Sequence, residues 1–224
     1  MKQKTLMLIT DISGYTRFIT RVGHEEGLIH AHELLQIIIN SNTLGLKLCE
    51  VEGDAVFFYT MKKMPSGQAI LSQISRTYRA FNHYLEQHNL SLELGIKFFL
   101  HTGECEEMRI GGRVKLFGTE VIKIHRLLKC ISDRSDYLLV TQNAKHLLPE
   151  LQDESVHGET AFPHIGPVSY NVFDGEFILR YSAQPVFYHH AISLISDAAH
   201  FVAREMGRQY RWYTQAVNML AGAV

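Results

Sequence analysis

The chain has 224 residues, of which 46% are apolar and 20% charged, and its formal net charge is −1. This length and apolar content allow one large domain with a buried core, or one domain with a helical appendage. The scattered basic residues, and the lack of any apolar run near the roughly 20 residues of a membrane span, argue against a nucleic-acid polymer or a membrane as partner.

The chain opens with a short buried strand. Residues 5–10 (TLMLIT) are apolar and rich in β-formers, and Asp11 follows them. No small-residue cleavage site follows this stretch, so it indicates a strand and not a signal peptide. Three cysteines without a CxxC pair are typical of reduced thiols, so we expect a cytoplasmic protein.

Two helices and a hairpin come next. Apolar residues at helical spacing predict helices over residues 24–40 and 68–88. Between them, residues 46–60 (LKLCEVEGDAVFFYT) contain two β-like runs separated by Glu-Gly-Asp, which is typical of a hairpin. Asp54 is expected to begin the second strand of that hairpin.

The second half of the chain predicts shorter elements. These are a strand over 92–101 that turns at Thr102-Gly103, a break at Gly111-Gly112, a helix over 119–130, a strand over 137–141, a helix over 142–148 and a closing hairpin over 165–183 around Asp174-Gly175. The order over residues 5–141 predicts an α+β fold, a ferredoxin-like βαββαβ sandwich with helices on one face of the sheet. We expect this domain to span residues 1–185. Residues 186–224 are expected to form a C-terminal helical extension that either packs on the domain or binds a partner.

Two aspartates at the strand ends are candidate metal ligands. In a split βαββ sheet, the first strand lies beside one strand of the hairpin, so Asp11 and Asp54 can meet at one end of the sheet. Two close carboxylates repel unless a cation lies between them, and hard oxygen ligands suit Mg²⁺ or Mn²⁺. The alternative is that each aspartate only forms a turn or caps a helix.

The turn after Asp11 is a candidate phosphate site. Residues 12–16 (ISGYT) enter a helix, and helix N-termini present free N–H groups to anions. Gly14 would allow close approach, with Tyr15 and Thr16 starting the helix.

Four segments together resemble the motifs of class III nucleotide cyclase domains. They are LITDISGYTRF, EVEGDAVFFY, FFLHTGE and KLFGTEVIKIHRLL, which occur in the family's order within roughly residues 5–180. The amino-acid sequence of the last segment is most similar to an uncharacterised bacterial branch of that superfamily. The resemblance implies a head-to-tail homodimer with two sites at its interface, and therefore a second copy of the chain as partner.

The resemblance also implies a reaction and its residues. Asp11 and Asp54, helped by the Ile12 carbonyl, would hold two Mg²⁺ or Mn²⁺ ions that bind a nucleoside triphosphate. The ribose 3′-hydroxyl would attack the α-phosphate, giving a 3′,5′-cyclic nucleotide and pyrophosphate. Arg126 of the partner chain would stabilise charge on the α-phosphate.

Base choice is implied to depend on Glu50 and Lys115. A glutamate at the first position is the residue type of guanylate-using members, and guanine offers N–H donors to a carboxylate and O6 to an ammonium. Lysine at the second position departs from the adenylate and guanylate members, so a pyrimidine base remains open. The alternative is a cross-strand ion pair between the two residues.

Two further departures leave the activity open. Ile122 stands where the family has a catalytic asparagine, and the adjacent Lys123 would point elsewhere on a helix. The late lysine that grips the terminal phosphates has no match near residues 164–166, although Arg180 or another lysine could replace it. The alternatives to a cyclase are therefore a catalytically impaired nucleotide-binding sensor of the same fold, or an interaction protein that acts through its aromatic tail, residues 201–213.

Overall fold

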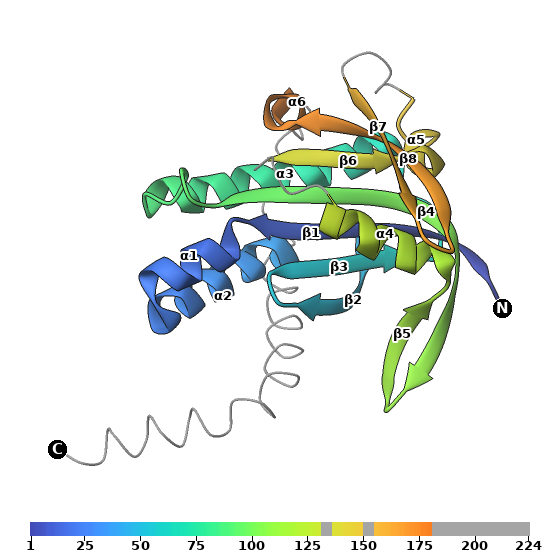
Figure 1. Cartoon of the computed structure of the whole chain (residues 1–224), viewed down its shortest axis with the longest axis horizontal. Helices are drawn as coiled ribbons and strands as arrows, with labels where there is room; N and C mark the ends of the chain where they lie inside the picture. Colours follow the sequence, from blue (N-terminus) through green and yellow to red (C-terminus); the bar gives the residue numbers. More distant parts are fainter. Residues whose placement is uncertain (131–135, 150–154, 181–224) are drawn as a thin grey trace. The chain divides into compact units, whose positions relative to one another are not determined.

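The computed structural model describes residues 1–130, 136–149 and 155–180, which form a mixed α+β fold around one sheet (Figure 1). The strands are β1 (Gln3–Ser13), β2 (Lys47–Glu52), β3 (Ala55–Thr60), β4 (Gly95–Ile110), β5 (Arg113–Phe117), β6 (Tyr137–Thr141), β7 (Val156–Phe162) and β8 (Gly166–Asp174). Their order is β2-β3-β1-β4-β6-β8-β7, and β5 pairs with β4 outside this path. The β4–β6 pair is parallel, and the other pairs are antiparallel.

Six helices accompany the described part of the sheet. They are α1 (Tyr15–Val22), α2 (His24–Asn40), α3 (Gly67–Gln87), α4 (Thr119–Cys130), α5 (Gln142–Lys145) and α6 (Gly175–Arg180). The helices predicted over 24–40, 68–88 and 119–130 are confirmed to within one residue, because long amphipathic patterns with clear ends specify them well. Among the described residues, none of these helices has the length and apolarity of a membrane span.

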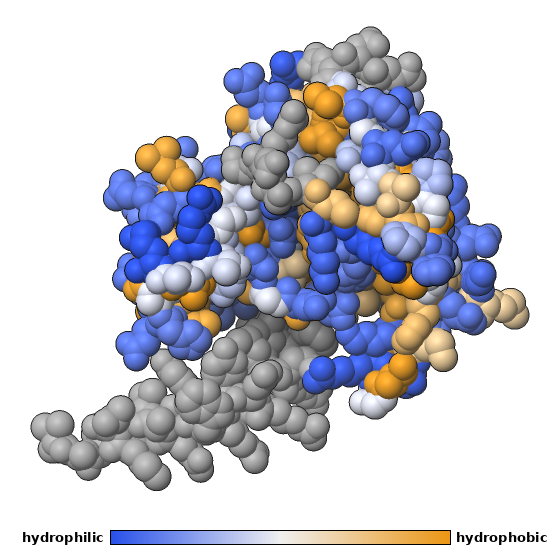
Figure 2. Space-filling model, viewed as in Figure 1, coloured by the Kyte–Doolittle hydropathy of each residue, from blue (hydrophilic) through white to orange (hydrophobic). Residues whose placement is uncertain are grey.

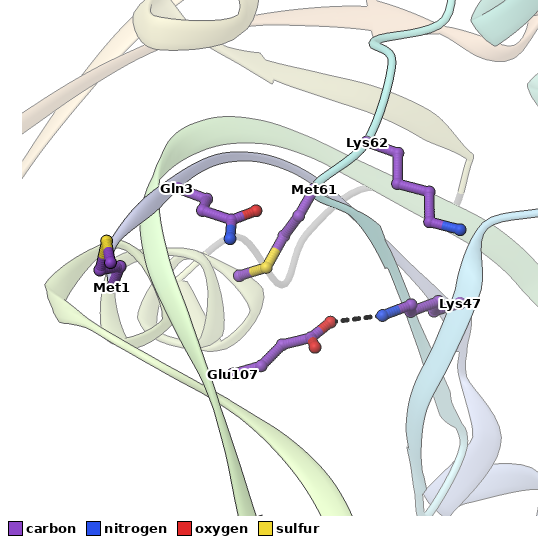
Figure 3. A pocket seen from close by; sticks show the side chains of 6 residues that line it. All are labelled: Met1, Gln3, Lys47, Met61, Lys62 and Glu107. Atoms are coloured by element: carbon purple, nitrogen blue, oxygen red, sulfur yellow. Dashed lines mark hydrogen bonds and ion pairs between the residues drawn. The ribbon is translucent and has the colours of Figure 1, made fainter.

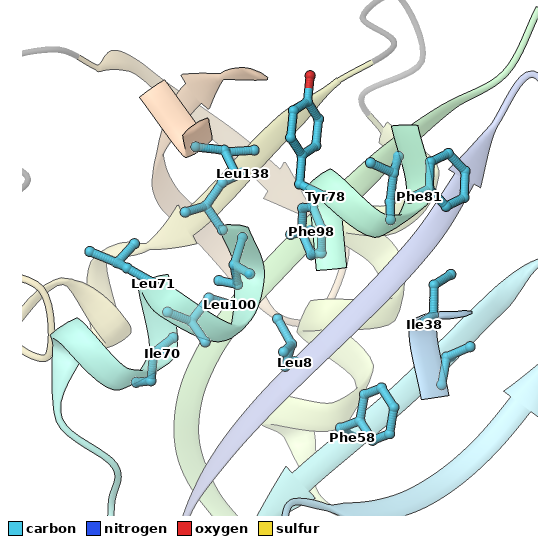
Figure 4. Close-up of a cluster of buried hydrophobic side chains, with 14 of the residues drawn as sticks. Leu8, Ile38, Phe58, Ile70, Leu71, Tyr78, Phe81, Phe98, Leu100 and Leu138 are labelled. Atoms are coloured by element: carbon cyan, nitrogen blue, oxygen red, sulfur yellow. The ribbon is translucent and has the colours of Figure 1, made fainter. Parts of the chain in front are cut away.

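Each face of the sheet carries its own core. The β1 residues Leu6 and Leu8 face α1, α2 and α3, whereas Met7 and Ile9 face α4, because successive strand residues point to opposite faces. Figure 4 shows the first core, where α3 packs on the sheet. The prediction that the helices of the βαββαβ core lie on one face of the sheet is therefore correct. The additional helix α4 covers the opposite face.

Two strands are longer than the sequence indicates. β1 continues through Asp11 to Ser13, so Asp11 lies within the strand and not beyond it, and Asp54 lies in the turn just before β3. The turn predicted at Thr102-Gly103 is wrong, because both residues pair with β1 and β4 runs on to Ile110. A Cβ at Gly103 would lie 2.3 Å from the Cγ of Glu120, so this glycine serves close packing of α4 and not a turn.

The predicted closing hairpin around Asp174-Gly175 is also wrong. β8 pairs instead with β7 through a turn at residues 163–165. Asp174 is the last residue of β8 and directly precedes α6, where its Oδ1 accepts a hydrogen bond of 2.9 Å from the Phe177 N–H. The Asp-Gly pair therefore marks a helix N-terminus. The helix predicted over 142–148 ends at Lys145, and the predicted boundary at residue 185 and the extension 186–224 lie outside the described residues.

Candidate functional site

Asp11 and Asp54 lie beside each other at one end of the sheet. Asp11 pairs across the strands with Ala55, the residue after Asp54. The Ile12 N–H donates to the Asp54 carbonyl over 3.2 Å, which ties the two backbones together. The antiparallel pairing of β1 and β3 thus brings together two carboxylates that are 43 positions apart in the sequence.

Both carboxyl groups are held in an environment that disfavours their charge. Burial, and then the charge of Asp54, raise the pKa of Asp11 to about 7, against the opposing effect of Lys97. Burial also raises the pKa of Asp54, against a backbone hydrogen bond and Lys97. A divalent cation between them would relieve both effects, because it supplies the missing positive charge.

The donor set suits a hard cation with open coordination positions. In the described part of the chain, no group of three or more His, Cys, Asp or Glu side chains could hold a metal ion. A cation at Asp11 and Asp54 would therefore have two side-chain carboxylates and would take its other ligands from backbone carbonyls, water or substrate oxygens. Mg²⁺ and Mn²⁺ commonly bind in this way at phosphate-transfer sites.

Lys97 is a site residue that the sequence reasoning missed. It pairs with Asp11 across β1 and β4, is 8% exposed, and its Nζ lies 3.9 Å from Asp11 Oδ2. The signal was present, because this lysine interrupts the apolar run LGIKFFL and must therefore have a buried partner. Its ammonium places a fixed positive charge beside the carboxylate pair.

Gly14 is required where β1 passes into α1. Its φ of 81° is left-handed, and a Cβ there would lie 2.2 Å from the Glu93 carbonyl oxygen. The Cα thus faces protein backbone, so close packing explains this glycine without a bound phosphate. The helix that follows, beginning with Tyr15 and Thr16, has no side-chain cap at its N-terminus and no acidic residue in its first turn. That arrangement leaves the helix end favourable for an anion.

Replacing Gly14 with Ala is expected to lower the free energy of unfolding by about 2 kcal/mol or more, because left-handed strain and a backbone clash add. The matched control is Gly53→Ala, since Gly53 has a φ of 60° with no heavy atom within 4 Å of the new Cβ. The control should lose about 1 kcal/mol. Urea unfolding of both variants tests this, and equal losses would contradict the clash at Gly14.

Arg126 contacts the turn between β7 and β8 of its own chain. Its Nη1 donates to the Pro163 carbonyl over 3.0 Å, and its guanidinium lies 5.8 Å from the Phe162 ring centroid. These residues adjoin the turn before β8, whereas Asp174 at the other end of β8 lies in the cross-strand row that contains Asp11. The nine residues of β8 span roughly 25 Å at about 3.3 Å per residue. The carbonyl that Arg126 binds therefore lies at the far end of β8 from the row that contains Asp11.

The α4 positions named by the sequence motif face different surroundings. Ile122 is 49% exposed, one turn before Arg126. The Lys123 ammonium donates to Glu120 Oε1 over 2.7 Å, a contact within α4. The sequence predicted that this side chain points in another direction than Ile122. The turn at residues 164–166, where no late lysine was found, lies beside the Arg126 contact at Pro163.

Glu50 and Lys115 form an ion pair between β2 and β5. The alternative in which they contact each other is therefore what the structure shows. His125, which the sequence reasoning did not select, lies on the other side of this carboxylate, with Nε2 3.8 Å from Glu50 Oε1. The three side chains are between 28% and 36% exposed, so the cluster remains open to solvent.

A buried polar network fixes the start of α4 on the sheet. Glu120 accepts from His101 Nε2 at 2.8 Å and from Lys123 at 2.7 Å, and His101 Nδ1 contacts Thr141 Oγ1 at 2.7 Å. The hydrogen bond from His101 is the main cause that lowers the pKa of Glu120 to about 2. Since His101 is 1% exposed, this pair positions the helix that carries Ile122 and Arg126.

Replacing Glu120 with Ala is expected to lower the free energy of unfolding by about 2–4 kcal/mol, because it leaves buried His101 without its partner. The depressed pKa means that this contribution is present above pH 4.5 and is lost as pH falls through about 2. Urea unfolding between pH 3 and pH 7 checks both points, with Glu120→Gln as a milder control that keeps an acceptor. A difference in free energy of unfolding between wild type and Glu120→Ala that grows toward pH 3 would contradict the lowered pKa of Glu120.

Two surface features lie outside this site. A depression of about 320 Å³ is lined by Met1, Gln3, Lys47, Met61, Lys62 and Glu107 (Figure 3). It lies at the opposite end of β1 from Asp11 and contains none of the predicted site residues. The β4–β5 hairpin carries the second feature, apolar side chains among charged ones near its end (Figure 2), including the exposed Met108 and Ile110.

Comparisons with protein sequences give relatives without an established function. A family model described as "Protein of unknown function (DUF2652)" matches residues 31–137. The "Uncharacterized protein Rv2561/Rv2562" of Mycobacterium tuberculosis is 31% identical over 138 residues, which cover 55% of this chain and 61% of that protein. The chain therefore matches less than two thirds of this relative's length.

Comparisons with solved structures identify the fold. The adenylyl cyclase CyaB of P. aeruginosa matches with a TM-score of 0.60 and 18% identity, over 78% of this chain and 96% of that one. The adenylate/guanylate cyclase/hydrolase of Silicibacter pomeroyi gives 0.55 and 17%, over 79% and 99%. The guanylate cyclase domain of RhGC from Catenaria anguillulae, solved in complex with GTP, gives 0.52 and 14%, over 77% and 97%.

Proposed function

We propose that this chain, which has the fold of class III nucleotide cyclase domains, is a metal-dependent nucleotide cyclase. It would convert a nucleoside triphosphate into a 3′,5′-cyclic nucleotide and pyrophosphate at the interface of a homodimer in the cytoplasm. The observation that carries the proposal is the pair of adjacent aspartates, Asp11 and Asp54, whose pKa values are both raised. Adjacent buried carboxylates of this kind suit divalent cations.

Each residue near the carboxylate pair has a role in this proposal. Asp11, Asp54 and the Ile12 carbonyl would hold two Mg²⁺ or Mn²⁺ ions, which when bound neutralise phosphate charge and activate the ribose 3′-hydroxyl. Lys97, beside Asp11, would bind phosphate oxygens and add positive charge to a site whose sequence lacks the late lysine. The N–H groups at Gly14, Tyr15 and Thr16 face an anion favourably at the start of α1.

A second copy of the chain supplies the remaining charge. Arg126 contacts the turn between β7 and β8 of its own chain, so in this proposal the arginine of each site comes from the other chain. The exposed apolar residues of the β4–β5 hairpin are consistent with a surface that a second chain covers. A two-fold dimer would then form two equivalent sites.

Ile122 favours a second candidate function, a nucleotide-binding sensor with little or no turnover. Its side chain is half exposed on α4 but has no polar atom, so it cannot orient the ribose as the family's asparagine would. Losing one oriented donor commonly costs on the order of 10²–10³ in rate. The carboxylate pair and Lys97 would still bind a metal–triphosphate complex.

The test is incubation of the purified chain with GTP, ATP, CTP or UTP and Mn²⁺, with detection of pyrophosphate and cyclic product. Product from one of them is the expected result. Metal-dependent binding of a non-hydrolysable triphosphate by calorimetry, without turnover, would select the sensor. A folded dimer that neither turns over nor binds any of the four would reject both functions.

A further inference from the structure

We propose that the depression at the end of β1 opposite Asp11 is a binding site for a small hydroxy acid, a molecule with one carboxylate, one hydroxyl group and an apolar body. The depression has a volume of about 320 Å³ (Figure 3). Ligand pockets start at roughly 300 Å³ and a water takes up about 30 Å³ in the liquid, so a ligand of roughly ten non-hydrogen atoms fits here. The inference goes beyond the proposed function and does not depend on it, because no residue of the proposed nucleotide site lines the depression.

A fixed carboxylate forms part of the wall of the depression. Glu107 Oε1 accepts from Lys47 Nζ over 2.6 Å and from the Tyr59 hydroxyl over 2.8 Å. The hydrogen bond from Lys47, and then that from Tyr59, lower the pKa of Glu107, so the carboxyl group is charged at neutral pH and only accepts hydrogen bonds. Its Oε2 has no hydrogen bond to another described residue. That oxygen can therefore accept from a donor on a ligand.

The side chains that line the depression carry two positive charges and one negative charge. Lys47 and Glu107 neutralise each other through their ion pair, whereas the Lys62 ammonium has no ion pair or hydrogen bond to another described residue. A ligand here therefore gains from one negative group, placed beside Lys62. An ammonium on the ligand would meet two lysines and a carboxylate whose charge is already balanced, so the donor for Glu107 is best a neutral hydroxyl.

Met61 supplies an apolar wall. Its side chain packs against the core on the sheet face that carries α4, and it lies between the Gln3 amide and the Glu107 carboxylate (Figure 3). A thioether side chain adapts readily to the shape of an apolar ligand. The Gln3 amide has no hydrogen bond to another described residue, so it can donate to the ligand as well. The depression thus combines an apolar wall, a cation and a fixed acceptor.

The test uses probes that share one carbon skeleton. They are 2-hydroxy-4-methylpentanoate, 4-methylpentanoate without the hydroxyl, and 4-methylpentane-1,2-diol without the carboxylate. We expect the hydroxy acid to bind, and the other two to bind about tenfold more weakly, because each loses a hydrogen bond to a charged group. Binding is followed by NMR of the chain with labelled methionine methyl groups. The Met61 signal should shift, whereas that of Met108, exposed on the β4–β5 hairpin, should not.

Three substitutions assign the contacts. Lys62→Gln should weaken the hydroxy acid about tenfold and leave the diol unchanged, because only the acid carries a carboxylate. Glu107→Gln keeps an oxygen for Lys47 and Tyr59 and puts an amide NH₂ in place of the free oxygen, so the hydroxy acid and 4-methylpentanoate should bind equally. Lys63→Gln is the matched control, since this exposed lysine does not line the depression, and it should change nothing.

Each contrary result identifies what is wrong. No shift of the Met61 signal with the hydroxy acid refutes the site. Equal losses in Lys62→Gln and Lys63→Gln refute the contact with Lys62, because general surface charge then explains the binding. Tighter binding of leucine, which has an ammonium in place of the hydroxyl, refutes the choice of hydroxy acids. None of these results bears on turnover or binding of triphosphates, so a failure here is distinct from a failure of the proposed function.

Discussion

Replacing Asp11 with Asn is expected to stabilise the metal-free chain while abolishing its response to Mn²⁺. The raised pKa of about 7 means that this carboxyl group contributes stability below pH 3.8 that is lost as pH rises through 7. At pH 8 the variant should therefore exceed wild type by about 1–3 kcal/mol in free energy of unfolding, since one pKa unit corresponds to about 1.4 kcal/mol. Turnover should fall below about 1% of wild type, because a metal ligand is lost.

Urea unfolding at pH 5 and pH 8, with and without Mn²⁺, measures both effects. Mn²⁺ should stabilise wild type and leave Asp11→Asn unchanged, because a ligand that binds only the native state raises its stability. Glu52→Gln is the matched control, since it removes an exposed carboxylate from the same hairpin as Asp54. A variant that is less stable than wild type at pH 8 would show that Asp11 has a structural role in place of metal binding.

Mixing two inactive variants is expected to restore activity. Arg126→Ala alone should lose turnover, because an arginine at the α-phosphate stabilises developing charge. In a dimer of one Asp11→Asn chain and one Arg126→Ala chain, one site carries both changes and the other carries neither. Random exchange at equal amounts makes half of the dimers mixed, so about a quarter of wild-type activity should return.

The separated variants provide the controls for this experiment. Each single variant should be inactive on its own. A chain with both substitutions should rescue neither single variant, because it contributes neither an intact Asp11 nor an intact Arg126 to a shared site. Size-exclusion chromatography with light scattering establishes that dimers form. Full inactivity of the mixture, despite mixed dimers, would mean that Arg126 acts on the aspartates of its own chain.

Long regular patterns made most of the fold predictable. The spacing of apolar residues specified α2, α3 and α4 to within a residue, and the Glu-Gly-Asp turn specified the β2–β3 hairpin. The adjacency of Asp11 and Asp54 followed from strand order alone. Two glycines were wrongly predicted to lie in turns. Gly103 makes room for the Glu120 side chain within β4, and Gly175 is the first residue of α6.

The remaining site features depend on tertiary contacts that no local pattern encodes. Lys97 could be found as a charge inside an apolar strand, but its partner depends on the β1–β4 register. His125 approaches Glu50 only because α4 lies over the face of the sheet that carries Phe57. The hydrogen bond from Arg126 to the Pro163 carbonyl depends on the pairing of β7 with β8. The sequence instead predicted a hairpin around Asp174-Gly175.

The unbroken course of β4 limits how this protein can vary in length. The strand runs for 16 residues, roughly 50 Å at about 3.3 Å per residue, and carries Lys97 near one end, His101 in the middle and Met108 near the other. A single inserted or deleted residue between them would turn the side chains beyond it to the opposite face. Homologues should therefore keep a constant spacing between these three positions of β4.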